Sequence, residues 1–184
     1  MRLELNNEVF FAEVKQLLSQ GESITITVKG NSMRPWLQDG KHKVVIKPHA
    51  GNIQCGDIAL FRHNGSHILH RAVKIESDKI TFAGDGNIGT KEFATTNDVV
   101  ALVESIITPS GRVIECSSKE WRTKSRLWLA LPQFARRIIL GILRRLSTKW
   151  FFLSSPTTLR LPSSGPVGLL VKNTSILILH HRTQ

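Results

Sequence analysis

The stretch DIALFRHNGSHILHRAVKI, residues 57–75, contains two β-rich runs, DIALF at 57–61 and HILHRAVKI at 67–75, separated by a polar turn with a glycine. Similar runs recur on both sides of it. They are ITITV at 24–28, KVVI at 43–46, KITFA at 79–83 and DVVALVESII at 98–107, the last followed by a Ser110-Gly111 turn into RVIE. Six or seven short strands in about 95 residues predict a compact, mainly β, multi-stranded domain rather than an alternating βαβ fold.

Helical patterns flank the predicted β domain, which we place at residues 22–118. Residues 1–21 are interpreted as a leading helix, because apolar side chains recur there at helical spacing. Residues 119–149 predict a basic amphipathic helix, or two helices with Pro132 in the first turn of the second. Residues 150–184 are a Ser/Pro/Thr-rich tail, for which two readings stay open: poor order, or a small hairpin of its GLLV and ILIL runs.

Charge is unevenly distributed along the chain. The net charge is +11, from 25 Lys and Arg against 14 Asp and Glu. Residues 1–118 hold 13 of each sign, so residues 119–184 carry the whole excess. This asymmetry indicates a neutral body with a basic element for an anionic partner.

The basic segment has an apolar stripe on a helical wheel. Its members are Trp128, Leu131, Ala135, Ile138, Ile139, Ile142 and Leu146, with Arg126, Arg137 and Arg144 nearly opposite. Such a helix suits the headgroup region of an anionic membrane, and the alternative is that the stripe packs on the β domain while the arginines are solvated. Nucleic-acid binding is disfavoured, because the segment has no recognisable helix-turn-helix and more aliphatic residues than a phosphate-binding arm needs.

Targeting and redox signals are few. Acidic residues at positions 4, 8 and 13 interrupt the region where a signal peptide needs an apolar run, and no uncharged apolar stretch is long enough to span a bilayer. We therefore expect no signal peptide, no transmembrane helix and a cytoplasmic or peripheral-membrane protein. Cys55 and Cys116 fit neither a metal site nor a disulfide framework, and we predict reduced core residues. No metal or other cofactor is required.

The loop Gly30-Asn31-Ser32-Met33-Arg34-Pro35 is the first candidate for chemistry. Ser32 has a glycine two residues before it and a proline three residues after it, which favours a sharply turned backbone. In such a loop the hydroxyl and the neighbouring amides can face a cleft and stabilise an oxyanion. On these residues alone, an ordinary polar turn remains an open reading.

Three further motifs follow GNSMRP (30–35) in order: CGDIALF (55–61), HILHRAVKI (67–75) and FAGDGN (82–87). Together the four motifs resemble those of type I signal peptidases and the related self-cleaving repressor peptidases, over about residues 22–115. The resemblance implies a serine endopeptidase with a compact β domain. Its substrate would be an extended polypeptide segment with small residues before the cleaved bond.

The resemblance also implies roles for individual residues. Ser32, which directly precedes Met33, would be the nucleophile. His70 stands before Arg71, where bacterial signal peptidases usually have lysine and the archaeal and endoplasmic-reticulum type has histidine. As an imidazole with an ordinary pKa of about 6.5, His70 can accept the serine proton near neutral pH. Asp85 of GDGN would match the acid that orients the imidazole.

The oxyanion site departs from the lysine-type pattern. Gly30 replaces the residue whose hydroxyl assists the oxyanion in those enzymes, leaving the Ser32 amide and the Asn31 side chain as donors. Met33 is assigned to the same loop and is expected to pack beneath it.

Several alternatives stay open. Asp57 competes with Asp85 as the acid, although a turn role at the strand entrance is favoured, and Lys74 competes with His70 as the base because alternation puts both on one face. Arg71 is expected to be a structural ion-pair partner. At the level of function, the alternatives are a repressor-type regulatory protein that cleaves itself, and a noncatalytic, membrane-associated binding module.

Overall fold

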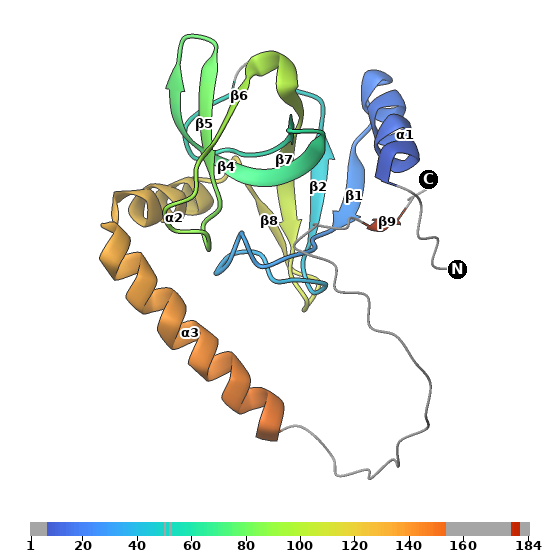
Figure 1. The fold of residues 1–184 in the computed structure, drawn as a ribbon. Helices are drawn as coiled ribbons and strands as arrows, with labels where there is room; N and C mark the ends of the chain where they lie inside the picture. Colours follow the sequence, from blue (N-terminus) through green and yellow to red (C-terminus); the bar gives the residue numbers. More distant parts are fainter. Residues whose placement is uncertain (1–6, 50, 52, 154–177, 181–184) are drawn as a thin grey trace, which may run out of the picture.

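The computed structural model describes residues 7–49, 51, 53–153 and 178–180, and its main feature is one antiparallel sheet (Figure 1). Nine strands pair in the order β6-β5-β4-β3-β7-β2-β1-β9, with β8 added to β7. The strands are β1 (Ile24–Thr27), β2 (Lys43–Lys47), β3 (Ile58–His63), β4 (Ser66–Glu76), β5 (Lys79–Ala83), β6 (Glu92–Thr95), β7 (Val99–Ile107), β8 (Val113–Glu115) and β9 (Ile178–His180). The prediction of a mainly β fold is confirmed.

In the described sequence, one helix precedes β1 and two helices follow β8. They are α1 (Asn7–Ser19), α2 (Lys119–Ala130) and α3 (Gln133–Leu153), and a 3₁₀ turn, η1 (Thr96–Asp98), joins β6 to β7. Ser118 caps α2 by accepting a hydrogen bond from the Trp121 amide at 3.2 Å. The chain leaves the helical conformation at Leu131, before Pro132, so the two-helix alternative is the correct one.

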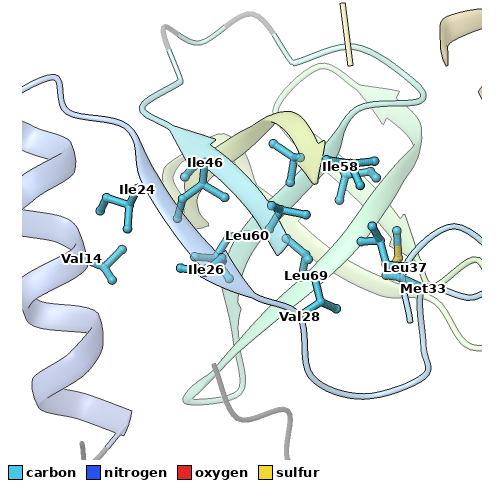
Figure 2. Close-up of a cluster of buried hydrophobic side chains, with 14 of the residues drawn as sticks. Val14, Ile24, Ile26, Val28, Met33, Leu37, Ile46, Ile58, Leu60 and Leu69 are labelled. Carbon is cyan, nitrogen blue, oxygen red and sulfur yellow. The ribbon is translucent and has the colours of Figure 1, made fainter. Parts of the chain in front are cut away.

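Apolar side chains are buried on both faces of the sheet. One core lies under α1, where Val14 packs beside Ile24 and Ile26 (Figure 2). The second core lies on the other face of β3 and includes Phe61 and Phe82, whose rings stack at 4.0 Å. Alternation along β3 explains the division, because Ile58 and Leu60 enter the first core while Ala59 and Phe61 enter the second.

The predicted apolar stripe of residues 119–149 is not a single surface. Trp128 in α2 is buried, whereas Ile138 and Ile142 in α3 are exposed, because the break at Pro132 turns the two helices in different directions. For α2 the packing alternative is therefore correct, and for α3 it is wrong. Figure 1 shows α3 extending away from the β domain.

One cysteine differs from the sequence prediction, and the C-terminal tail lies partly outside the described residues. Cys55 is exposed, not in the core, because it lies in the turn before β3, while Cys116 packs against the first core. The GLLV run falls outside the described residues, so the predicted hairpin stays a prediction. The described part of the tail, β9, pairs with β1.

Candidate active site

The loop that carries Ser32 is held by buried anchors on one side and hydrogen bonds on the other. Met33 and Leu37 are buried in the first core, which fixes the loop from below. The Gly30 amide donates to the Asp39 carboxylate at 3.0 Å. Gly30 therefore has a structural role in the loop, where its φ of +89° favours glycine. Its amide is already hydrogen-bonded and is not available to an oxyanion.

Within the described residues, the backbone amides at Ser32 are free in this anchored loop. Its amide and that of Met33 form no hydrogen bond within the described part of the chain, and neither does the exposed Asn31 side chain. These groups are available to a ligand, and adjacent backbone N–H groups are the usual donors to an oxyanion.

The GDGN turn contacts the serine loop through two glycines. The Gly86 amide donates to the Ser32 carbonyl at 2.7 Å. A Cβ on Gly84 would lie 2.6 Å from that carbonyl oxygen and 2.9 Å from Nε2 of His70, and a Cβ on Gly86 would lie 2.7 Å from the Asn31 carbonyl. The serine backbone and the tip of the imidazole thus flank the same glycine, which no larger residue could replace without movement.

His70 is oriented by an acid that the sequence analysis missed. Its Nδ1 lies 2.9 Å from Oε2 of Glu92, and both side chains are buried, with 5% and 11% exposed. A carboxylate at this distance accepts the Nδ1 proton, which leaves the lone pair on Nε2. No hydrogen bond occupies Nε2, or joins Ser32 Oγ to it, among the described residues. His70 is therefore set up to receive a proton at Nε2.

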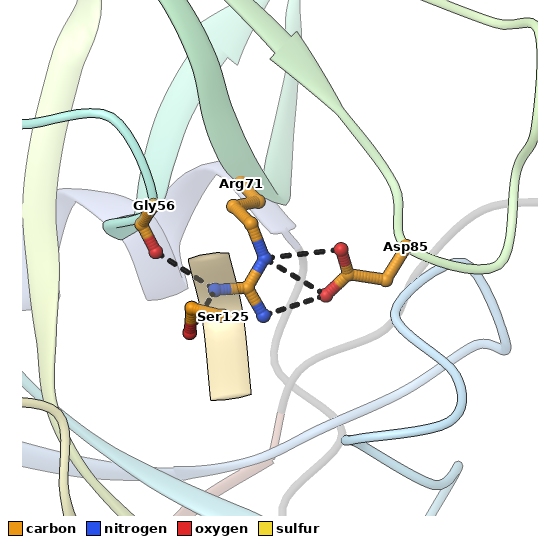
Figure 3. A network of polar contacts seen from close by, with 4 residues as sticks. All are labelled: Gly56, Arg71, Asp85 and Ser125. Carbon is orange, nitrogen blue, oxygen red and sulfur yellow. Dashed lines mark hydrogen bonds and ion pairs between the residues drawn. The ribbon is translucent and has the colours of Figure 1, made fainter. Parts of the chain in front are cut away.

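Asp85 does not orient His70, contrary to the sequence expectation. Its carboxylate accepts three hydrogen bonds from Arg71, at 2.7 Å from Nη2 and 3.0 Å twice from Nε (Figure 3). The reason is strand geometry: His70 and Arg71 are consecutive on β4, so their side chains point to opposite faces. The acid that pairs with one cannot reach the other.

Arg71 also ties α2 to the site. Its Nη1 donates to the Gly56 carbonyl at 2.8 Å and to the Ser125 hydroxyl at 2.9 Å (Figure 3). The guanidinium lies 5.5 Å from the Trp121 ring centroid, and Trp36 of the serine loop contacts the Trp121 and Trp128 rings edge-on. The expected structural role of Arg71 is confirmed, and α2 buttresses the serine loop.

The other titratable candidates have structural contacts. Asp57 accepts a hydrogen bond from the Gln54 amide at 2.9 Å, which is the turn role favoured from the sequence. Lys74 is exposed and bound to Glu76 at 2.7 Å, so it is not the partner of Ser32. Within the described residues, no group of three or more metal-binding side chains is present.

A small recess beside Ser32 has a volume of about 10 Å³. Its walls include Val28, Met33, Leu60 and Leu69, together with His67. The His67 ring stacks on Phe11 at 3.5 Å, and burial, followed by the charges of Lys15 and Arg62, lowers its pKa to about 4. His67 is thus a neutral wall at pH 7, and the recess has room for about one water-sized group.

The family model described as Peptidase S24-like matches residues 3–102, more than half of the chain. The chain belongs to the Peptidase S24-like family. The match confirms the resemblance to the superfamily of repressor peptidases and signal peptidases, and it supports a serine-peptidase or repressor-type self-cleaving fold. The family includes serine peptidases and noncatalytic members. No curated protein matches the sequence. The match ends within β7, before β8, α2 and α3.

Proposed function

We propose that this S24-like protein is a serine endopeptidase in which Ser32 is the nucleophile, His70 the general base and Glu92 the residue that positions the base. One observation supports the proposal above all: a buried carboxylate holds Nδ1 of His70 while Nε2 lies against Gly84, whose other neighbour is the Ser32 backbone. Base and orienting acid are then in the relation that nucleophilic serine catalysis requires.

The proposed mechanism moves one proton back and forth. Ser32 Oγ bonds to the scissile carbonyl carbon as its proton passes to Nε2 of His70, and the amides of Ser32 and Met33 bind the oxyanion. The Glu92 side chain, 2.9 Å from Nδ1, stabilises the imidazolium. His70 then gives the proton to the leaving amine as the C–N bond breaks. Water, deprotonated by His70, hydrolyses the acyl-enzyme and restores Ser32.

The recess beside Ser32 limits the substrate. With room for about one water-sized group, it accepts a methyl but not a long or aromatic side chain. The proposed substrate is an extended polypeptide with a small residue, such as alanine, immediately before the cleaved bond.

The test is cleavage of a fluorogenic peptide with alanine before the bond. Ser32→Ala and His70→Ala are expected to lower kcat by at least about 10³-fold, and Glu92→Gln by about 10² to 10⁴-fold. Glu104→Gln, which removes an exposed carboxylate bound to Lys47, is the matched control and should leave the rate unchanged. Wild-type rates in both Ser32→Ala and His70→Ala would refute the mechanism.

Two controls separate peptidase action from its alternatives. A serine-directed acylating probe should label Ser32, and a protein that the probe never labels is a noncatalytic member of the family. The intact mass of purified protein should stay constant, because the proposed substrate is another chain, and a mass that falls with time would indicate self-cleavage instead.

We also propose that α3 holds this domain at an anionic membrane surface. Phe134, Ile138 and Ile142 recur every fourth residue and are 67%, 59% and 53% exposed, which makes one apolar stripe facing outward. Basic residues surround it, and Glu120 is the single acid from residue 119 to 153. This combination is the one that binds anionic headgroups. None of the described helices has the length and hydropathy to span a bilayer.

Vesicle co-sedimentation tests the membrane proposal. The full chain should bind phosphatidylglycerol vesicles and not phosphatidylcholine vesicles. Ile138→Glu should weaken binding by about tenfold or more, because burying an isoleucine is worth about 1.5–3 kcal/mol. Val113→Glu, at an apolar position in β8 that is 53% exposed, is the control. Equal sedimentation of the wild type and Ile138→Glu would overturn the proposal.

A further inference from the structure

One edge of β1 is covered by β9, a strand that comes from far along the chain (Figure 1). β1 pairs with β2 on one side and with β9 on the other. β9 is antiparallel to β1, and Ile178 lies opposite Thr27, the last residue of β1 before the loop that carries Ser32. Residues 154–177 can span at most about 80 Å, and α3 is about 30 Å long, so the chain can return from the far end of α3 to its own β1.

The direction of the backbone groups shows which of them face β9. The Val28 amide donates to the His42 carbonyl at 3.0 Å, and the Val28 carbonyl accepts from the Gly40 amide at 2.8 Å, so both point to the β2 side. In an antiparallel sheet, the backbone groups of consecutive residues point to opposite sides. Those of Thr27 and Lys29 therefore point away from β2, to the side where β9 lies.

This row of backbone groups leads to the candidate nucleophile. β9 pairs with residues 25–27. The Lys29 amide and carbonyl form no hydrogen bond within the part of the chain that the structure describes. Lys29 and Gly30 both line the recess beside Ser32. An extended polypeptide that adds to this edge and enters the recess would therefore lie along an edge whose first part β9 occupies.

We propose that β9 is a resident strand on the edge of β1, and that an extended polypeptide must displace it to reach Ser32. Three residue pairs join β9 to β1. Local opening of such a short edge strand costs far less than unfolding the sheet, so the strand can exchange with another. The docking of β9 rests on the strand register alone, whereas the shielding of Ser32 also rests on the proposed function.

A disulfide tests the docking independently of cleavage. Thr27→Cys and Ile178→Cys, combined with Cys55→Ser in the full chain, put thiols on directly opposite residues, within reach of a disulfide. Mild oxidation should link them within one chain, which non-reducing electrophoresis shows. Asp78→Cys with Ile178→Cys, whose first thiol lies in the exposed turn between β4 and β5, is the control and should stay reduced. Disulfide-linked dimers, or equal oxidation of the control, would overturn the proposal.

Peptide binding tests the shielding. A fluorescein-labelled, alanine-rich peptide is titrated against the disulfide variant carrying Ser32→Ala, with fluorescence anisotropy as the readout. The oxidised protein should bind at least about tenfold more weakly than the same protein after reduction, because a locked strand leaves that edge closed.

Proline variants test the same point without cysteines. His180 lies opposite Thr25, so its amide faces β1, and His180→Pro removes that donor. This variant should bind the peptide at least about fivefold more tightly than Thr183→Pro, because proline at position 183 lies beyond the residues paired with β1.

Each outcome decides the proposal. Equal affinity before and after oxidation, no binding in either state, or equal affinity of the two proline variants would overturn it. Binding that oxidation abolishes, in a protein whose wild type cleaves no peptide, would support the resident strand and refute the peptidase. Cleavage by the wild type, without a disulfide between positions 27 and 178, would support the peptidase and refute the resident strand.

Discussion

The buried ion pair between Arg71 and Asp85 should be one of the strongest energetic couplings in this protein. Arg71 is completely buried and Asp85 is 3% exposed, and three hydrogen bonds join them. We consider three variants, namely Arg71→Met, Asp85→Leu and the two together. They ask whether Asp85 acts through Arg71, as the geometry indicates, or through the imidazole, as the sequence suggested.

The expected magnitudes follow from what each variant leaves unpaired. Asp85→Leu leaves a buried guanidinium without its carboxylate, and Arg71→Met leaves a buried carboxylate without its guanidinium, so each should cost about 3–5 kcal/mol. The double variant contains neither charge. Its remaining cost is the lost partner of the Gly56 carbonyl and the Ser125 hydroxyl, about 1–3 kcal/mol. The coupling energy should therefore be about 3 kcal/mol or more.

Urea unfolding monitored by tryptophan fluorescence gives the four free energies of unfolding. The exposed pair Lys47–Glu104, at 2.8 Å, is the control cycle and should couple by less than about 1 kcal/mol. Additive effects of Arg71→Met and Asp85→Leu, within about 0.5 kcal/mol, would contradict the predicted coupling, because partners in one buried network cannot be independent.

Three other predictions follow from single side chains. Gly84→Ala should destabilise the fold by about 1–3 kcal/mol and prevent acylation of Ser32 by a serine-directed probe, whereas Gly141→Ala, with open space around it, should do neither; thermal unfolding and mass spectrometry measure both. Because the pKa of His67 is lowered to about 4 in the folded protein, the unfolded chain binds a proton on this side chain at a higher pH than the folded chain does. The free energy of unfolding should therefore fall as the pH drops from about 6.5 to 4. Urea unfolding of His67→Gln should show a shallower pH dependence. Burial raises the pKa of Cys116 to about 12, so iodoacetamide at pH 8 should alkylate the exposed Cys55 and leave Cys116 unmodified until the chain is unfolded; equal labelling in the native protein would contradict this.

Local patterns predicted most of the strands, because alternation of apolar side chains reports which residues face a core. They missed β6, a short strand whose phenylalanine faces outward and whose glutamate faces inward. Phe93 is 51% exposed and stabilised by Lys79 above its ring, while Glu92 is buried. A hydrophobicity pattern would place Phe93 in the core and Glu92 at the surface. The structure has the reverse arrangement, because the buried Glu92 carboxylate pairs with His70, two strands away.

The order of the motifs predicts that Ser32 and His70 share one site. In the structure the Ser32 carbonyl and Nε2 of His70 both border Gly84, and the catalytic roles of the two residues stay a prediction. The acid was different because sheet register decided it. Glu92 lies opposite Phe82, and Phe82 lies opposite Ala72. Residues directly opposite share a face, and His70, two positions before Ala72, shares it too. Glu92 carried no local sequence signal, because alternation in β6 puts Phe93 and not Glu92 at the position expected to face inward.

Local sequence patterns were enough to predict the β-rich body, the turned loop of Ser32, the histidine before Arg71 and the confinement of excess charge to residues 119–184, since each is a property of neighbouring residues. Only the folded chain shows which acid faces His70, why Asp85 pairs with Arg71, and that Trp128 of α2 is buried while Ile138 and Ile142 of α3 are exposed. These depend on register and on the direction of the chain after Pro132, which are set by contacts between residues far apart in the sequence.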